Sequence, residues 1–361
     1  MKEYSARSNS KHGESGRIGV LLTNLGTPDA PTKKALRPYL KEFLSDPRVI
    51  ELPRFRWWLV LNLLILNTRP KKSAELYQKI WTKEGSPLLV ITEKQAAKLE
   101  RELQAQFGEQ IIVEIGMGYG NPSIASALAA LRERGMEKLL VLPLFPHYSG
   151  TTTASMFDAV TNALQKWRAI PEFRMVMNYH DEPGYITALA RVTQELWDRE
   201  GKPEKLVMSF HGIPLRYSQG GDPYFAQCHK TGRMLAEALD LGTDHYIISF
   251  QSLFGKEEWL RPYTDETLRQ LAASGTKAVD VICPGFLGDC LETLEEIDGL
   301  NRELFLHAGG ERFRYIPCLN DRNDLIQCLA QLVVRHTQGW EVAGNTSTEK
   351  ESLRANQSRF R

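Results

Sequence analysis

Residues 205–217 read KLVMSFHGIPLRY, and the character of the chain changes sharply within this stretch. Residues 206–208 form a short apolar run typical of a buried strand, and Gly212 and Pro214 then end the strand in an irregular turn. His211 is therefore expected at the carboxyl end of a strand, where open parallel α/β sheets bind ligands. Its imidazole can exchange a proton near neutral pH or bind a metal. A histidine satisfied by backbone groups at a strand end fits this stretch equally well.

Outward from this stretch, short apolar segments alternate with helical segments along most of the chain. The expected strands are residues 18–25, 111–115, 139–145, 173–179, 206–210, 245–250, 278–282 and 312–316. The expected helices are residues 35–44, 72–81, 87–107, 121–134, a segment ending near 169, 184–199, 223–240, 264–273, 290–307 and 322–335. Such alternation predicts an α/β fold of two doubly wound domains, each a parallel sheet flanked by helices, with a ligand cleft between them.

The domain boundaries are predicted from the same pattern. We expect a disordered tail at 1–16, a first domain at 17–170 joined by 318–337, a second domain at 171–317, and a polar tail at 338–361. The boundary between the two domains is placed at the connection near Pro171. The terminal helix is expected to return to the first domain.

The composition is that of a soluble globular protein, with 42% hydrophobic and 25% charged residues. A net charge of +1 gives no electrostatic footprint for nucleic acid. The amino-terminal residues lack the apolar region of a secretory signal, and the five cysteines form no CxxC pair, so we expect reduced thiols and a cytoplasmic location. Neither GxGxxG nor GxxxxGK[ST] occurs, so no nucleotide cofactor is expected.

The most apolar window is FRWWLVLNLLIL, residues 55–66, flanked by Arg54, Arg56 and Arg69. These twelve residues are too few to cross a bilayer, which takes about 20. A core helix is one interpretation. The adjacent tryptophans and flanking arginines also suit a lip that grips a flat apolar ligand or touches a membrane surface.

A second informative stretch, CPGFLGDCLETLEEID at residues 283–298, follows an expected strand and opens a helix. Asp289, Glu292 and Glu296 have the i, i+3, i+7 spacing of one helix face. Acids at a helix start also favour its positive end, and many such runs are simply solvated. A histidine facing carboxylates suits proton removal or delivery of a divalent metal, whereas no motif for hydrolysis is present.

These residues resemble the ferrochelatase family, the bacterial-type protohaem ferro-lyases. The supporting matches are SFHGIPLRY with GDPYFAQC, FLGDCLETLEEID, NLGTP (24–28), FLSDPRVIELP (43–53), GSPL (85–88), YGNPSI (119–124), LPLFPHYSGTTT (142–153) and SFQSLFGKEEWL (249–260). The resemblance implies two similar four-stranded Rossmann-like domains around a porphyrin cleft. It also implies insertion of Fe(II), a substrate, into protoporphyrin IX to give protohaem with release of two protons.

The resemblance also implies roles for individual residues. His211 and Glu292 are the expected metal-binding and proton-handling pair, and Glu296, with Asp289 as a further candidate, continues the acidic track. The expected porphyrin-binding residues are Arg69, Tyr77, Tyr119, Ser252, Trp259 and Phe286, with residues 53–70 as the lip.

Two departures from the family pattern matter. No cysteine follows Cys328 and Gly150 stands at an internal ligand position, so no iron–sulfur cluster is expected. Cys290 stands where some relatives have a histidine, and we interpret it as an inert thiol. The alternatives left open are a coproporphyrin ferrochelatase, another tetrapyrrole metal chelatase and a non-catalytic porphyrin or haem carrier. Weak membrane contact through the lip and the oligomeric state are also left open.

Overall fold

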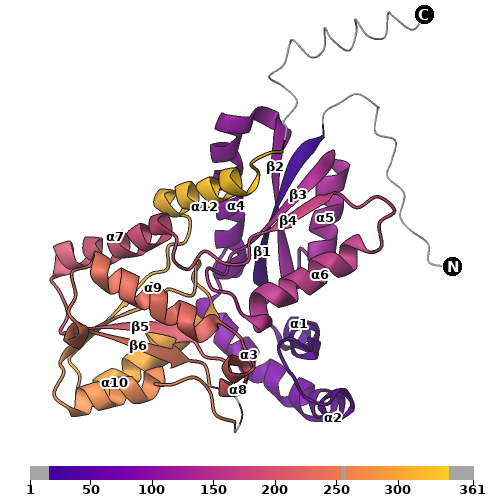
Figure 1. The fold of residues 1–361 in the computed structure, drawn as a ribbon. Coiled ribbons are helices and arrows are strands. Elements are labelled where there is room, and N and C mark those ends of the chain that lie inside the picture. The colour runs from indigo at the N-terminus through magenta and orange to yellow at the C-terminus, as the bar shows by residue number, and fades with distance from the viewer. Residues whose placement is uncertain (1–15, 254, 256, 341–361) are drawn as a thin grey trace, which may run out of the picture.

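The computed structural model describes residues 16–253, 255 and 257–340. Apart from residue 16, the expected amino-terminal tail lies outside the described residues, as does the polar tail from residue 341 onward. The described chain forms two α/β halves (Figure 1), each built on a four-stranded parallel sheet.

The first sheet has the strand order β2-β1-β3-β4 and the second has β6-β5-β7-β8, so the two halves repeat one topology. The strands are β1 (Arg17–Thr27), β2 (Ile111–Gly120), β3 (Met136–Pro143), β4 (Glu172–Met175), β5 (Lys205–His211), β6 (Tyr246–Gln251), β7 (Ala278–Ile282) and β8 (Arg312–Ile316). The repeated order confirms two similar doubly wound domains. In each half, the order reverses beside the first strand, which is where such sheets bind ligands.

Helices cover the faces of both sheets. The α-helices are α1 (Lys33–Ser45), α2 (Arg54–Val60), α3 (Leu66–Ile80), α4 (Pro87–Phe107), α5 (Ile124–Glu133), α6 (Ser155–Leu164), α7 (Pro183–Glu200), α8 (Leu215–Gln219), α9 (Tyr224–Ala238), α10 (Thr264–Ala273), α11 (Arg302–His307) and α12 (Asn323–His336). The π-helices are η1 (Leu61–Ile65), η3 (Gly150–Ala154) and η5 (Glu292–Asn301), and the 3-10 turns are η2 (Gly108–Gln110) and η4 (Thr243–His245). No helix within the described residues is long and apolar enough to cross a membrane.

Two details of the predicted boundaries are wrong. β4 pairs with β3, from Lys138 opposite Glu172 to Val141 opposite Met175, so the strand expected to open the second domain completes the first sheet. Trp340, expected in the polar tail, is buried and its ring lies under the guanidinium of Arg174. A large aromatic side chain gains more from burial than the surrounding polar sequence suggests.

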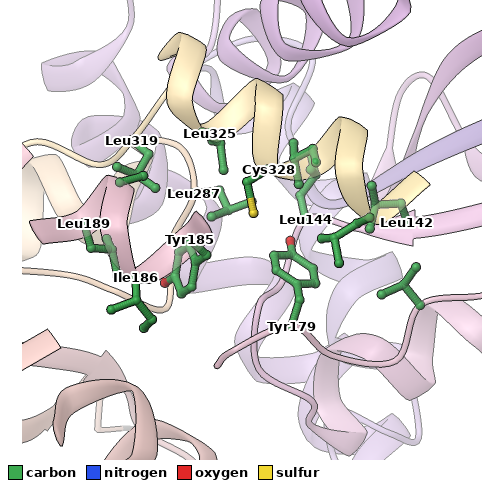
Figure 2. Packing of buried hydrophobic residues seen from close by; sticks show 14 of the residues in the cluster. Leu142, Leu144, Tyr179, Tyr185, Ile186, Leu189, Leu287, Leu319, Leu325 and Cys328 are labelled. Carbon is green, nitrogen blue, oxygen red and sulfur yellow. The ribbon is translucent and has the colours of Figure 1, made fainter. Parts of the chain in front are cut away.

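One hydrophobic cluster extends from the first sheet to the second. Figure 2 shows the part of it where Leu142 and Leu144 meet residues of α7 and α12. The cluster includes Leu142 of β3, Tyr185 of α7, Met208 of β5 and Leu325 of α12, all of them almost fully buried. Burial of each such side chain stabilises the fold by about 1.5–3 kcal/mol. Since these residues come from both halves, the halves are joined by a shared core.

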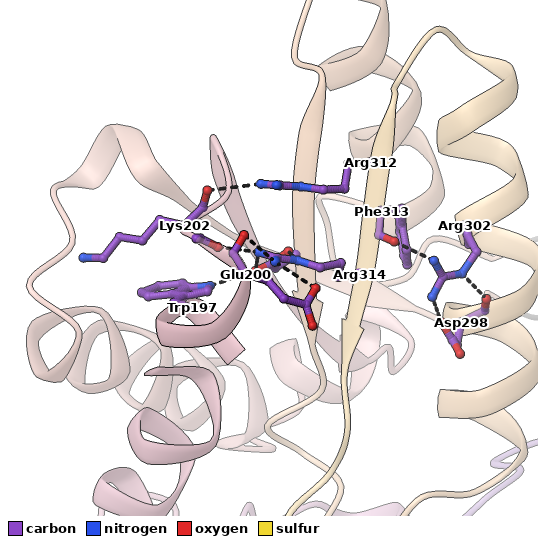
Figure 3. Close-up of polar contacts among 10 residues, drawn as sticks. Trp197, Glu200, Lys202, Asp298, Arg302, Arg312, Phe313 and Arg314 are labelled. Atoms are coloured by element: carbon purple, nitrogen blue, oxygen red, sulfur yellow. Dashed lines mark hydrogen bonds and ion pairs between the residues drawn. The ribbon is translucent and has the colours of Figure 1, made fainter. Parts of the chain in front are cut away.

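A buried ion pair ties the second sheet together at the end away from His211. The Arg314 guanidinium donates to both carboxylate oxygens of Asp280, at 2.7 and 2.8 Å, and to the Gly201 carbonyl at 2.8 Å. The Trp197 indole N–H donates to the same carboxylate at 2.7 Å. Figure 3 shows Arg314 reaching toward Glu200 and Trp197 at the end of α7.

We expect Arg314→Met to lower the free energy of unfolding by about 3–5 kcal/mol, because it leaves the fully buried Asp280 carboxylate without its cation. Urea unfolding measures the loss. The double variant Asp280→Leu/Arg314→Met, which removes both charges, should recover most of it. A single variant as stable as the parent would contradict this reading of the pair.

Candidate active site

His211 is the last residue of β5 and lies where the order of the second sheet reverses. Its Nδ1 lies 2.6 Å from the Gly212 carbonyl oxygen, and a carbonyl can only accept, so Nδ1 carries the hydrogen. The lone pair is therefore on Nε2, which can take a proton or bind a metal. A Cβ on Gly212 would lie 2.9 Å from the Gln251 carbonyl oxygen and 3.1 Å from the Trp259 ring, so glycine is required there.

Two aromatic side chains stand beside this imidazole. The centroid of the His211 ring lies 6.4 Å from that of Trp259 and 6.5 Å from that of Phe286. Both residues were predicted to bind substrate, and the structure brings them to the same histidine. Rings in this arrangement can line a pocket for a flat apolar ligand.

The helix that carries the acids is not the α-helix expected over 290–307. Residues Glu292–Asn301 form the π-helix η5, and only Arg302–His307 are α-helical. Its i→i+5 bonding changes which residues share a face, and π-helical turns are frequent at functional sites. The predicted face of Asp289, Glu292 and Glu296 is therefore wrong in part. Asp289 precedes η5 and its carboxylate accepts from Tyr315, Thr293 and Asn320 instead.

Glu296 lies on the His211 side of η5 and is held by Ser252. The Ser252 backbone N–H and hydroxyl both donate to its carboxylate, at 2.8 and 2.5 Å. Burial raises the pKa of the Glu296 carboxyl above its ordinary value. The Ser252 hydroxyl and nearby His211 pull this pKa down, and Glu292 pushes it up. Ser252, predicted to bind porphyrin, thus holds a carboxylate.

Glu292 opens η5 next to Tyr77, Tyr39 and Cys290. The Tyr39 hydroxyl donates to the Gly26 carbonyl at 3.3 Å and is hydrogen-bonded to the Tyr77 hydroxyl. Burial raises the pKa of Tyr77 well above its usual value, and nearby Tyr39 and Glu292 add to the rise. Burial likewise raises the pKa of the Cys290 thiol, reinforced by the Glu292 carboxylate. A thiol kept protonated in this way agrees with the interpretation of Cys290 as inert.

An ion pair joins the two halves beside this cluster. Lys79 of α3 donates to Glu295 of η5 at 2.8 Å, and the Glu295 side chain is only 6% exposed. The pair connects the helix that carries Arg69 and Tyr77 to the helix that carries the carboxylates.

Two predicted substrate residues lie differently from the others. Tyr119 is buried, and its hydroxyl is hydrogen-bonded to Asp46 at 2.7 Å and to Ser155 at 2.9 Å. It therefore packs behind the lip rather than presenting a free hydroxyl. Arg69 is exposed near the amino end of α3.

The apolar window forms α2, η1 and the start of α3. One side of these helices is buried in the core, and the other side is exposed. Trp57 is buried and its indole N–H donates to the Leu44 carbonyl at 2.6 Å. Phe55, Trp58 and Leu63 are 75%, 57% and 68% exposed. A hollow of about 290 Å³ lies in this lip, lined by Ser45, Arg54, Phe55, Trp57, Trp58 and Leu61.

Sequence reasoning missed Tyr39, Lys79 and Gln251. Gln251 stands next to Ser252 within the recognised SFQSLFG stretch, so its neighbourhood was available as a signal. Tyr39 and Lys79 lie in ordinary amphipathic helices, and nothing in their local pattern separates them from core or surface residues.

Comparisons with solved structures define the class of fold. The chain is similar to SirB from Bacillus subtilis with Fe3+, with a TM-score of 0.54 and 10% identity over 89% of this chain and 96% of that one. It is also similar to the sirohydrochlorin chelatase SirB from Bacillus subtilis subspecies spizizenii in complex with cobalt, with a TM-score of 0.53 and 11% identity over 91% and 98%. At these identities the likeness concerns the fold alone, which is the two-domain fold of these chelatases.

Comparisons of sequence define the family. Residues 17–337 match the family model described as Ferrochelatase. A ferrochelatase of Hydrogenovibrio crunogenus is 57% identical over 94% of this chain and 90% of its own length, and one of Marinobacter nauticus is 53% identical over 95% and 93%. The chain belongs to the ferrochelatase family and is an enzyme, which confirms the resemblance.

Proposed function

We propose that this chain inserts Fe(II) into protoporphyrin IX, giving protohaem and releasing two protons. The observation that carries the proposal is the His211 imidazole, whose Nε2 bears the lone pair and whose ring lies beside those of Trp259 and Phe286 and close to the carboxylate of Glu296. Membership of the ferrochelatase family supports this chemistry.

Metal entry requires removal of both pyrrole protons from the ring. His211 Nε2 is placed to accept a proton as a general base. Glu292 and His211 supply one carboxylate and one imidazole for the entering Fe(II), which is a substrate here. Glu296, held by Ser252, offers the next carboxylate for a departing proton.

The macrocycle is proposed to lie against Trp259, Phe286 and Tyr77, and to be bent toward the form that accepts metal. Walls that fit the bent ring better than the flat one lower the barrier, since only interactions gained in the transition state accelerate the reaction. Arg69 at the rim is suited to pair with a propionate. Tyr119 contributes by packing behind the lip.

The choice of protoporphyrin over coproporphyrin rests on the lip. Its exposed Phe55, Trp58 and Leu63 are better matched to apolar vinyl groups than to additional propionates. We further propose a cytoplasmic location, because all five cysteines are unpaired thiols. The absence of an iron–sulfur cluster and of a nucleotide cofactor stays a prediction, and acid-labile sulfide in untagged protein would contradict the first part.

The lip is also proposed to touch membrane surfaces weakly. We expect Trp58→Ser/Leu63→Ser to reduce co-sedimentation of the protein with anionic lipid vesicles severalfold, because it removes exposed apolar area flanked by Arg54 and Arg56. Ile170→Ser, at a residue that is 59% exposed outside the lip, serves as the control. Equal sedimentation of all three proteins would rule out contact through the lip.

The function is tested anaerobically with purified protein, protoporphyrin IX and Fe(II), by following loss of porphyrin fluorescence as the metallated spectrum grows. Many turnovers per protein molecule above the protein-free rate support the proposal. A stoichiometric spectral shift without turnover would instead identify a carrier or the wrong tetrapyrrole, and coproporphyrin in the same assay separates those two cases.

A further inference from the structure

Gln251, the last residue of β6, joins the segment that carries His211 to the helix that carries Glu292. The residue is 4% exposed, and both ends of its side-chain amide are hydrogen-bonded. The amide Nε2 donates to the Glu292 carbonyl at 3.1 Å, and Oε1 accepts from the Ser209 hydroxyl at 2.7 Å. Its backbone carbonyl accepts from the Gly212 N–H at 2.7 Å.

The sheet register fixes Gln251 relative to the histidine. Gln251 is paired with His211 between β6 and β5, and the Gly212 bond follows directly after that pair. The backbone of Gln251 is therefore tied to the His211 strand, while its side chain is tied to the first residue of η5. One residue thus links the backbone beside the imidazole to the backbone of the residue that carries the first carboxylate.

The next residue holds the second carboxylate. Ser252 donates twice to the Glu296 carboxylate, so the consecutive residues Gln251 and Ser252 bond to the Glu292 backbone and to the Glu296 side chain of η5. The backbone of Ser252 has a φ of +69°, which residues other than glycine rarely adopt. A π-helix is a rare conformation, and these outside hydrogen bonds hold its first turns in place.

We propose that Gln251 is a positioning residue, which holds Glu292 at a working distance from His211 without touching the porphyrin. This inference rests on the proposed function, because it assumes that His211 and Glu292 act together on one ring. Misplacement of a reacting group by about 1 Å can cost about a hundredfold in rate, so a single bridging side chain is enough to matter.

The test variant is Gln251→Met, which keeps the length of the side chain and removes the amide hydrogen bonds to Glu292, Ser209 and the Cys283 thiol. We expect kcat for Fe(II) insertion to fall by about tenfold to a hundredfold. The KM for porphyrin, and its affinity measured by fluorescence titration, should stay within about twofold, since the aromatic walls are untouched.

Ser249→Ala is the matched control. Ser249 is fully buried and its hydroxyl bonds to Thr264 at 2.9 Å, in the same polar network as Ser209, yet it contacts neither His211 nor Glu292. We expect similar loss of thermal stability in both variants but unchanged kcat for Ser249→Ala. Should Gln251→Met fail to fold, Ser209→Ala, which removes the 2.7 Å hydrogen bond to Gln251 Oε1, should lower kcat with unchanged KM.

The outcomes are distinguishable. If the parent protein shows no turnover, the proposed function is refuted. If the parent is active, three results would overturn the positioning role: an unchanged kcat in Gln251→Met, an equal fall of kcat in Ser249→Ala, or a rise in the porphyrin KM of Gln251→Met that parallels its fall in kcat. A fall in kcat confined to the Gln251 and Ser209 variants supports it.

Discussion

The His211→Ala variant is expected to lose metal insertion almost completely while it still binds porphyrin. The variant removes Nε2, the proposed proton acceptor beside Trp259 and Phe286, and a positioned general base contributes about a hundredfold to ten-thousandfold in rate. Porphyrin affinity should change little, because the aromatic walls remain. Single-turnover fluorescence measures the rate, and fluorescence titration measures the affinity.

His307→Ala is the matched control, since His307 is exposed on α11 and its Nδ1 bonds only locally, to the Glu303 carbonyl. It should retain full activity. If His211→Ala still turns over at the parent rate, His211 has no part in the chemistry. If it loses porphyrin binding instead, His211 is a substrate contact rather than a base.

The Glu292→Gln variant is expected to lower kcat by about a hundredfold and to raise the KM for Fe(II), with porphyrin affinity retained. The amide keeps the shape of the side chain and removes the charge that a divalent metal favours. Steady-state kinetics with each substrate varied in turn measures the change.

This variant also separates an enzyme from a carrier, which needs no carboxylate beside the histidine. Glu303→Gln, an exposed acid on α11, controls for loss of negative charge near η5. Unchanged kinetics in Glu292→Gln would remove Glu292 from the mechanism, and an equal effect of Glu303→Gln would reduce its role to general electrostatics.

Most of the fold could be predicted because parallel strands leave continuous apolar runs. Residues 206–208 and 139–142 are such runs, and both are buried in sheets. The assignment of β4 to the second domain failed because a strand can join the edge of either sheet. The sequence of residues 172–175 does not indicate which of the two sheets it joins. The π-helix η5 could not be anticipated, because its sequence has ordinary α-helical spacing and its outside hydrogen bonds come from β6.

The site was predictable where a reactive side chain stands at the carboxyl end of a predicted strand. His211 is the last residue of its strand, and the structure places it beside Trp259, Phe286 and Glu296; their roles stay predictions. The hydrogen bonds that Ser252 and Gln251 make to η5 were not predictable, because their partners lie about 40 residues further along the chain. Asp289 is the opposite case: it was a candidate for the acidic track, but its carboxylate accepts structural hydrogen bonds from Tyr315, Thr293 and Asn320.

The core shared by the two sheets has a mechanical consequence. Opening the halves like a hinge would expose Leu142, Leu325 and their neighbours to water, at about 25 cal/mol for each square ångström of apolar surface. The lip residues Trp57 and Leu61 belong to a separate cluster, so a movement of the lip alone would leave the shared core buried. The two halves therefore form one rigid frame, and we expect adjustment to a bound macrocycle to come from the lip rather than from separation of the halves.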